Sequence, residues 1–197
     1  MSTAIFKPDS PCVRPSLSGY CERVRALVSQ ARFEHIMRVT SLADTIGRAN
    51  GFSSAELRVT ALAAILHDAA RDLSREQLFE LAPPETALER EHPLAVHGRA
   101  SRALAEQWGV TDERVLDAVE GHVFGVATSN RVGMALYIAD VSEPGRGVND
   151  DIRELAMSNL FAAYQRAVDS KVTYLRAKGK AVHPATLRVY HELCHSA

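Results

Sequence analysis

The segment from Ser53 to Asp68, SSAELRVTALAAILHD, decides the fold. Ser53 and Glu56 stand three positions apart and form a capping box, which predicts the first turn of a helix. The residues that follow are apolar over most of the surface of such a helix, so we expect it to be the buried helix at the centre of the protein. This helix runs directly into His67 and Asp68. Two polar side chains therefore end the segment that we expect to be most deeply buried.

Helical spacing of apolar residues continues on both sides of this segment. No stretch alternates apolar and polar residues as a half-buried strand does, so the sequence predicts an all-α fold, a single helical bundle. Residues 84–93 and 125–130 are expected to be loops. In chain order we expect a helix around Val24, a helix through Phe33 and Ile46 that ends at Asn50-Gly51, the central helix, a short helix from Ser74 to Pro83, helices over about 94–108, 112–121 and 131–141, a long helix from Asn149 or Asp150 to Leu175, and a final helix after Pro184.

The composition is that of one folded domain. The chain has 197 residues, of which 46% are hydrophobic and 24% charged, which is enough for a substantial core. Its 23 basic and 24 acidic residues nearly balance, which argues against nucleic acid or an anionic membrane as the main partner. Residues 1–18 contain Pro8, Pro11 and Pro15. We therefore expect a flexible N-terminal leader over 1–18 and the folded domain over 19–197.

Targeting signals and cysteine spacing both favour a cytoplasmic protein. The N-terminus has no apolar stretch of signal-peptide length, and the longest apolar run, 61–66, is too short for a transmembrane helix. Cys12, Cys21 and Cys194 show neither a disulfide framework nor the spacing of a zinc ribbon.

A buried carboxylate such as Asp68 is costly unless it is paired or bound to a metal ion. The simplest alternative is that Asp68 pairs with a nearby arginine such as Arg71 while His67 donates a hydrogen bond to a backbone carbonyl. Two further polar residues, His35 and Asp140, also lie on helices that are otherwise apolar. Two histidines and two carboxylates from three helices suit a divalent transition metal that keeps open positions for water or phosphate.

The order His35, then His67-Asp68, then Asp140 resembles the HD-domain metal-dependent phosphohydrolases, whose fold is a single helical HD bundle. Within that superfamily the chain resembles the YqeK family of symmetrical bis(5'-nucleosyl)-tetraphosphatases over residues 20 to 193. The segments that carry this second resemblance are Arg32-Phe33-Glu34-His35, Leu66-His67-Asp68-Ala69-Ala70-Arg71, His97-Gly98, Gly121-His122 and Tyr137-Ile138-Ala139-Asp140-Val141-Ser142-Glu143-Pro144-Gly145-Arg146.

The resemblance implies hydrolysis of diadenosine tetraphosphate into two ADP at a centre of two metal ions, iron in the first place and manganese as an alternative. It implies that Asp68 bridges the ions, that His35, His67 and Asp140 complete one site, and that His97 and His122 hold the second ion. The expected catalytic residues are Asp68, Arg71 and Arg146, and the expected substrate-binding residues are Arg32, Arg71, Glu143, Arg146 and Gly125. Glu143 can instead orient Arg146 or a ligating histidine.

Two positions depart from the family pattern. Arg71 stands where the family usually has lysine, and His122-Val123-Phe124-Gly125 has valine in place of a threonine. Two alternatives therefore stay open: an HD phosphohydrolase that acts on another nucleotide or phosphoester, and a helical module that binds a nucleotide without turnover. A homodimer is also left open.

The remaining aromatic and imidazole side chains are assigned to structure. We expect His92, His183, His191 and His195 to be structural or exposed. Trp108 and Tyr137 are expected in the core. The chain has no nucleotide-binding glycine-rich loop of the P-loop or dinucleotide type.

Overall fold

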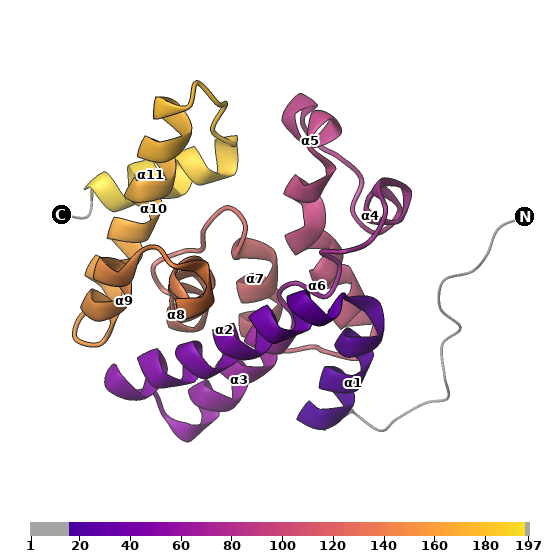
Figure 1. Cartoon of the computed structure of the whole chain (residues 1–197), viewed down its shortest axis with the longest axis horizontal. Coiled ribbons are helices and arrows are strands. Elements are labelled where there is room, and N and C mark those ends of the chain that lie inside the picture. The colour runs from indigo at the N-terminus through magenta and orange to yellow at the C-terminus, as the bar shows by residue number, and fades with distance from the viewer. Residues whose placement is uncertain (1–15, 196–197) are drawn as a thin grey trace, which may run out of the picture.

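Helix α3 (Ser54–Leu66) is buried only in its second half: Thr60 and residues 63–66 are buried, whereas residues 54, 55 and 58 are exposed, so the prediction of a helix buried throughout is wrong for its first half. In the computed structural model, which describes residues 16–195, the Ser53 side chain accepts from the Glu56 backbone while the Glu56 side chain accepts from the Ser53 backbone. The described residues contain helices and no β-strand (Figure 1). The other helices are α1 (Leu17–Leu27), α2 (Gln30–Ala49), α4 (Arg75–Leu81), α5 (Ala87–Glu91), η1 (Pro93–Val96), α6 (His97–Gln107), α7 (Glu113–Gly121), α8 (Arg131–Ser142), η2 (Pro144–Arg146), α9 (Asp150–Ala156), α10 (Leu160–Ala177) and α11 (Pro184–His195).

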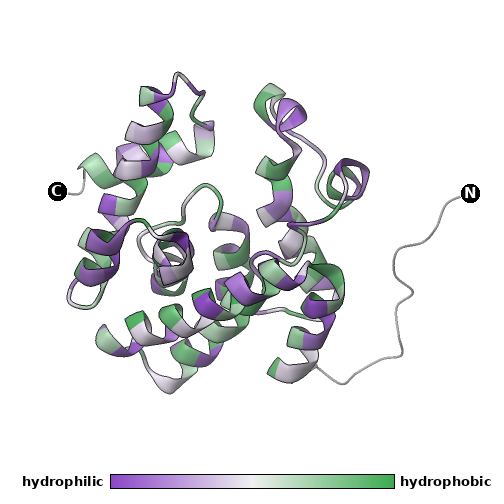
Figure 2. Cartoon of the chain, viewed as in Figure 1, coloured by the Kyte–Doolittle hydropathy of each residue, from purple (hydrophilic) through white to green (hydrophobic). Residues whose placement is uncertain are grey.

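A second apolar helix, α8, shares the core with α3. Residues 132–139 of α8 are all buried, so this helix must be covered on every side. Helices α2 and α7 each pack against both α3 and α8, and α10 covers α8 further along the chain. The helices at the outside carry hydrophobic and hydrophilic stripes side by side (Figure 2). The prediction of an all-α fold is confirmed.

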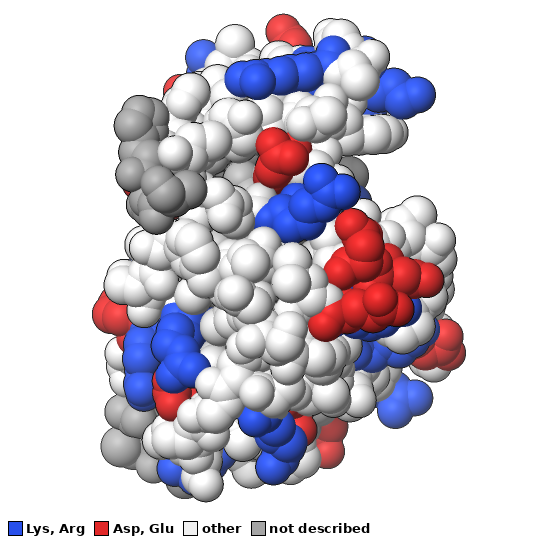
Figure 3. Space-filling view, turned by 90° about the vertical axis from the view of Figure 1, so that its left-hand side faces the viewer, with Lys and Arg blue, Asp and Glu red and all other residues white. Residues whose placement is uncertain are grey.

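The core leaves two groups of helices on its flanks. Helices α4, α5 and α6 lie on one side of α7, and α9, α10 and α11 lie on the other side (Figure 1). Seen from the side of α9 to α11, the surface is hollowed at one edge, between an end where basic side chains gather and a group of acidic side chains (Figure 3).

Three predicted element boundaries are wrong. The expected loop over 84–93 contains α5, because Thr86 and Glu89 form another capping box. The expected helix over 94–108 begins as the 3-10 turn η1 and becomes α-helical only at His97. The expected long helix divides into α9 and α10, because the side chain of Asn159 caps a new helix by accepting from the Ala162 N–H.

Other predictions agree with the structure or fall outside it. Trp108 and Tyr137 are buried, as expected. Helix α1 begins at Leu17, within the predicted leader 1–18, but residues 1–15 and the cysteine at position 12 lie outside the described residues, so the leader stays a prediction. Among the described helices, none combines the length and the hydrophobicity that a membrane span needs.

Candidate metal centre

Five helices bring the six predicted ligands together next to the core. His35 lies inside α2, His67 and Asp68 directly follow α3, His97 begins α6, His122 directly follows α7, and Asp140 lies in the last turn of α8. Neighbouring imidazole rings have centroids 4.8 to 5.7 Å apart. The C-terminal ends of α3, α7 and α8 therefore meet at the cluster. Because the last carbonyls of a helix carry partial negative charge, this meeting point favours a cation.

Each imidazole of the cluster uses Nδ1 to bind the protein. His67, His97 and His122 each lie 2.5 to 2.7 Å from the backbone carbonyl three residues earlier, which can only accept. The Nδ1 of His35 lies 3.1 Å from Oε1 of Glu143. These partners place the proton of a neutral ring on Nδ1, so that its Nε2 is a lone pair that faces the cluster.

The carboxylate of Asp68 lies between two pairs of histidines. Its Oδ2 atom is 3.5 Å from His67 Nε2 and 3.7 Å from His35 Nε2. Its Oδ1 atom is 3.1 Å from His97 Nε2 and 3.5 Å from His122 Nε2. Each oxygen of Asp68 therefore faces a different pair of imidazoles.

Asp140 joins one of these two pairs. Its Oδ1 atom lies 3.1 Å from His35 Nε2 and 4.0 Å from His67 Nε2. His35, His67 and Asp140 offer ligand atoms within 4.8 Å of one another, and so do His67, Asp68 and His122. The side chains gathered on the His35 side of Asp68 and on its His97 side therefore supply two adjacent sets of nitrogen and oxygen donors.

Burial and mutual charge set the protonation of the cluster. Burial lowers the pKa of His122 to about 4, which keeps that ring neutral. Burial acts in the same direction on His67, but the charge of Asp68 outweighs it and the pKa of His67 is raised. Burial raises the pKa of Asp68, yet the surrounding imidazoles, with the charge of His67 first among them, hold it well below its usual range. Asp68 is thus an anion at neutral pH.

The donor set fits a transition metal ion. The Nε2 atom of His67 is fully buried and has no hydrogen-bond partner among the described residues, which is costly for a polar atom unless something else binds it. Neutral imidazole and carboxylate groups are the ligands that zinc, iron and manganese accept in proteins. An ion at this place would satisfy the unpartnered nitrogen.

The three predicted phosphate-binding arginines lie in different environments. Arg32 donates to Asp68 Oδ2 over 2.9 Å and His67 faces the Ala64 carbonyl, so an arginine does pair with Asp68 as the simplest alternative expects, but it is Arg32 and not Arg71. Arg146 binds both the backbone carbonyl and the carboxylate of Asp140. Arg71 has no ion-pair or side-chain hydrogen-bond partner among residues 16–195. Arg71 is therefore the free cation of the three.

Glu143 and Gly125 are both enclosed by protein groups. Glu143 is buried and accepts from His35, from Arg38 over 2.7 Å and from the Gly145 N–H over 2.6 Å. This geometry supports the interpretation in which Glu143 orients a histidine, and Arg146 is not its partner. A Cβ on Gly125, whose φ of +111° favours glycine, would meet the side chains of Tyr164 and Val189 at 3.0 Å. The substrate-binding roles of these two residues stay predictions.

Sequence reasoning missed two cations near the cluster. Arg38 follows His35 by one helical turn and holds Glu143 behind it. Lys171 comes from α10, 31 positions after Asp140, and its Nζ atom donates to the backbone carbonyl of Val123, directly after His122. A signal for Lys171 exists in the sequence, because this lysine lies on the face of the expected helix that carries Val168 and Val172.

The histidines that we expected to be structural or exposed lie outside the cluster wherever the structure describes their side chains. His92 and His191 are exposed. His183 stacks on Phe124 with ring centroids 3.8 Å apart and lies 3.3 Å from Glu89 Oε1. Both outcomes agree with the prediction. The side chain of the histidine at 195 lies outside the described residues.

Comparison with known proteins places the cluster in a family. The HD domain model matches residues 32–154. A Bacillus subtilis protein named "Bis(5'-nucleosyl)-tetraphosphatase, symmetrical" is 30% identical over 86% of this chain and 93% of its own length. A Mycoplasma genitalium protein named "Probable nicotinate-nucleotide adenylyltransferase/Ap4A hydrolase" is 30% identical over 72% of this chain, which spans only 42% of that longer relative.

A solved structure has the same fold. It is the crystal structure of a predicted HD superfamily hydrolase involved in NAD metabolism from Clostridium acetobutylicum. It superposes with a TM-score of 0.84 over 94% of this chain and all of that chain, at 24% sequence identity. At this identity the likeness establishes the helical fold.

Proposed function

The chain belongs to the HD domain family, and from this membership we propose that it is a metal-dependent phosphohydrolase that splits diadenosine tetraphosphate symmetrically into two ADP. The symmetrical tetraphosphatase of Bacillus subtilis supports the substrate, because the two chains align over most of both lengths. A second relative with that name, from Staphylococcus aureus, is 29% identical over 64% of this chain. The absence of a cysteine framework supports the cytoplasm, where nucleotides are abundant, as its place of action.

The observation that carries the proposal is the position of Asp68 between two pairs of imidazoles. One carboxylate oxygen faces His35 and His67, and the other faces His97 and His122. A carboxylate placed in this way can bind two ions at once. A single structural ion would need only one of the two pairs. The arrangement therefore supports a centre for two ions rather than one.

We assign the first ion to His35, His67, Asp68 and Asp140, and the second ion to Asp68, His97 and His122. Iron is the proposed metal and manganese the alternative, since mixed imidazole and carboxylate donors suit both. When bound, such ions activate water and neutralise phosphate oxygens. Asp68 and Asp140 would hold them as anions, and the carbonyl partners of Nδ1 would keep His67, His97 and His122 in the ligating tautomer.

The arginines supply the rest of the phosphate site. A substrate with four linked phosphates is a polyanion, and the chain has a net charge of only −1, so attraction must be local. Arg71 has a guanidinium without a partner in the part of the chain that the structure describes, and it stands three residues after Asp68. We assign it to the central phosphates, where water adds to one phosphorus and the other ADP leaves with the bond electrons. Arg146 and Arg32, which hold Asp140 and Asp68 here, are further candidates.

A product analysis tests this function. Protein loaded with iron or manganese is incubated with diadenosine tetraphosphate, and the products are separated by ion-exchange chromatography. ADP as the sole product supports symmetrical cleavage. Equal amounts of AMP and ATP would show asymmetrical cleavage and contradict the proposal. The Asp68→Asn variant is the control for a contaminating hydrolase.

A second substrate class is favoured by one position. Val123 stands where the tetraphosphatase family pattern has threonine, so the residue after His122 lacks the hydroxyl group of that pattern. Another nucleotide or phosphoester would then be the substrate of the same centre. A panel of nucleotides offered to the loaded protein separates the two readings by kcat/KM. Thermal stabilisation by nucleotide without any product would instead indicate a binding module.

A further inference from the structure

The turn that follows His122 is fastened by α10, a helix outside the matched HD region. The Nζ of Lys171 donates to the carbonyl of Val123. The hydroxyl of Tyr164 donates to the carbonyl of Val126 over 2.8 Å and accepts from the Val126 N–H over 2.6 Å. The HD match ends at residue 154, so both fastening side chains come from the part of the chain that follows it.

The turn needs such a fastening because α7 ends at its start. His122 is the first residue past α7, and its Nδ1 is held by the Val119 carbonyl at 2.6 Å. Beyond it, the amides of Phe124 and Gly125 both return to the Gly121 carbonyl. The Val123 carbonyl is not used by the helix, and the ammonium of Lys171 is the donor that binds it. The peptide after His122 is thereby fixed from the opposite side of the core.

Lys171 is partly buried, and a charged group at such a place is costly if it serves packing alone. Its ammonium lies 5.7 Å over the ring of Tyr137, and it has no ion pair with any carboxylate among residues 16–195. Burial lowers its pKa to about 8, although the charge of Asp140 opposes this. A methionine of similar length would fill the same space without that desolvation cost. A role other than packing therefore accounts for the lysine.

We propose that Lys171 is a positioning residue that fixes His122 for the ion held by Asp68, His97 and His122. The inference rests on the two-ion centre of the proposed function. Helix α10 thus completes a centre whose ligands all come from α2 to α8. None of the ligands of the other ion, His35, His67, Asp68 and Asp140, lies on the turn after His122, so the hydrogen bond to Val123 acts on the second ion. The charge of Lys171 also acts on Asp140, and Lys171→Arg keeps that charge.

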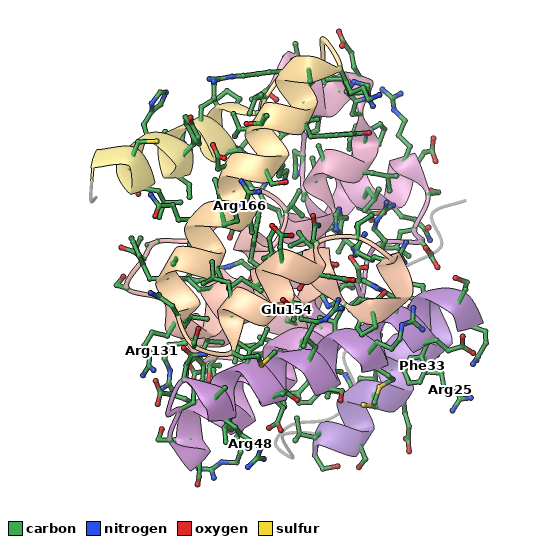
Figure 4. The ribbon with its side chains drawn as sticks, turned by 60° about the vertical axis from the view of Figure 1, so that its left-hand side comes forward. Arg25, Phe33, Arg48, Arg131, Glu154 and Arg166 are labelled. Carbon is green, nitrogen blue, oxygen red and sulfur yellow. The ribbon has the colours of Figure 1, made fainter. Side chains whose placement is uncertain are left out.

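The test compares Lys171→Met with Lys171→Arg, which keeps a donor, and with Arg166→Met. Arg166 lies on the same helix (Figure 4), is exposed and pairs with Asp151. Bound manganese per chain is measured by titration of metal-free protein, and melting temperatures of the metal-free proteins are recorded. We expect Lys171→Met to weaken the second ion about 10- to 100-fold and to change the affinity for the first ion much less. We expect Lys171→Arg and Arg166→Met to resemble the wild type.

The stability readout separates positioning from a structural role. We expect the melting temperature of metal-free Lys171→Met to stay within about 4 °C of the wild type. Tyr164→Phe, which removes the hydroxyl from the same turn, is expected to weaken the same ion. Equal weakening of both ions with a large loss of stability would overturn the inference. If Lys171→Met binds two ions as tightly as the wild type does, the inference about Lys171 is overturned but the proposed function is not. If the wild type itself binds fewer than two ions, the two-ion centre of the proposed function is overturned as well.

Discussion

The Nε2 atoms of His97 and His122 lie 2.9 Å apart, although the Nδ1 of each ring faces a backbone carbonyl that can only accept. In neutral rings both Nε2 atoms are then lone pairs, and two lone pairs at this distance repel each other. A shared proton or a cation between them removes the repulsion. Because burial lowers the pKa of His122 to about 4, a proton is held weakly at neutral pH, and a metal ion is the better partner.

Replacing Asp68 with asparagine is expected to remove both ions. The change deletes the anion that faces both histidine pairs and leaves an amide nitrogen that cannot ligate. We expect metal analysis of Asp68→Asn to give close to no bound metal and hydrolysis to be lost. Asp72→Asn is the matched control, because Asp72 accepts from the Ser29 N–H outside the cluster. An Asp68→Asn protein that retains the metal content of the wild type would refute the bridging role.

Glu143→Gln should weaken only the ion on the His35 side. Burial raises the pKa of Glu143, but hydrogen bonds from Arg38, His35 and Gly145 hold it at about 2, so it is an anion that supports the ligating tautomer of His35. We expect metal affinity on that side to fall about 10- to 100-fold, measured by competition with a chelator. Glu34→Gln is the control, because Glu34 is an exposed carboxylate on α2 directly before His35. Weakening of both ions alike would contradict this assignment.

The ligand set could be predicted because its members break a strong pattern. His67 directly follows, and Asp140 lies within, a run of buried apolar residues at the end of a helix, and a polar side chain at such a place has few explanations. The partners of these ligands could not be predicted in the same way. Arg32 and Lys171 are long side chains that reach other helices, and which group a long flexible cation meets depends on tertiary packing rather than on local spacing.

The misplaced helix boundaries have a local cause. The long apolar stripe from Ile152 to Leu175 predicts one helix. Hydrophobic spacing shows which face is buried, but it does not reveal a break between two helices when the apolar residues keep the same spacing across the break. The side chain of Asn159 caps the start of a new helix. In the sequence, Ser158 and Asn159 are compatible both with one continuous helix and with two separate helices. In contrast, the capping box at Ser53 and Glu56 could be predicted, because it is a defined pair of residues three positions apart.

Arg71→Ala is expected to reduce catalysis without a loss of stability. The Arg71 guanidinium has no partner among the described residues, so its removal breaks no contact of the folded protein. If it binds phosphate, the lost stabilisation of the transition state is about 3 kcal/mol, or about a hundredfold in kcat/KM. Arg71→Lys should restore part of the activity. Steady-state kinetics with diadenosine tetraphosphate and melting curves measure both. Arg58→Ala, an exposed arginine on α3, is the control.

Glu89 is expected to make stability depend on pH below its ordinary pKa. Burial raises the pKa of Glu89, but hydrogen bonds from the Glu85 and Thr86 backbone and the charge of Arg99 outweigh it, so the pKa is lowered from 4.5. The unfolded state then binds more protons as the pH falls below about 4.5, and the folded state loses stability there. The Glu89 contribution is present at neutral pH and disappears on acidification.

The measurement compares Glu89→Gln with the wild type by denaturant unfolding of metal-free protein from about pH 7 to about pH 3.5. At pH 7 we expect Glu89→Gln to be less stable by about 1–3 kcal/mol, because the amide cannot accept from all the donors that now face the carboxylate. The difference should shrink as the pH falls through the folded pKa, since the wild type then also loses its anion. Glu85→Gln is the control, because that side chain is 72% exposed and also pairs with Arg99. A difference for Glu89→Gln that stays constant across this range would show that its charge does not stabilise the fold.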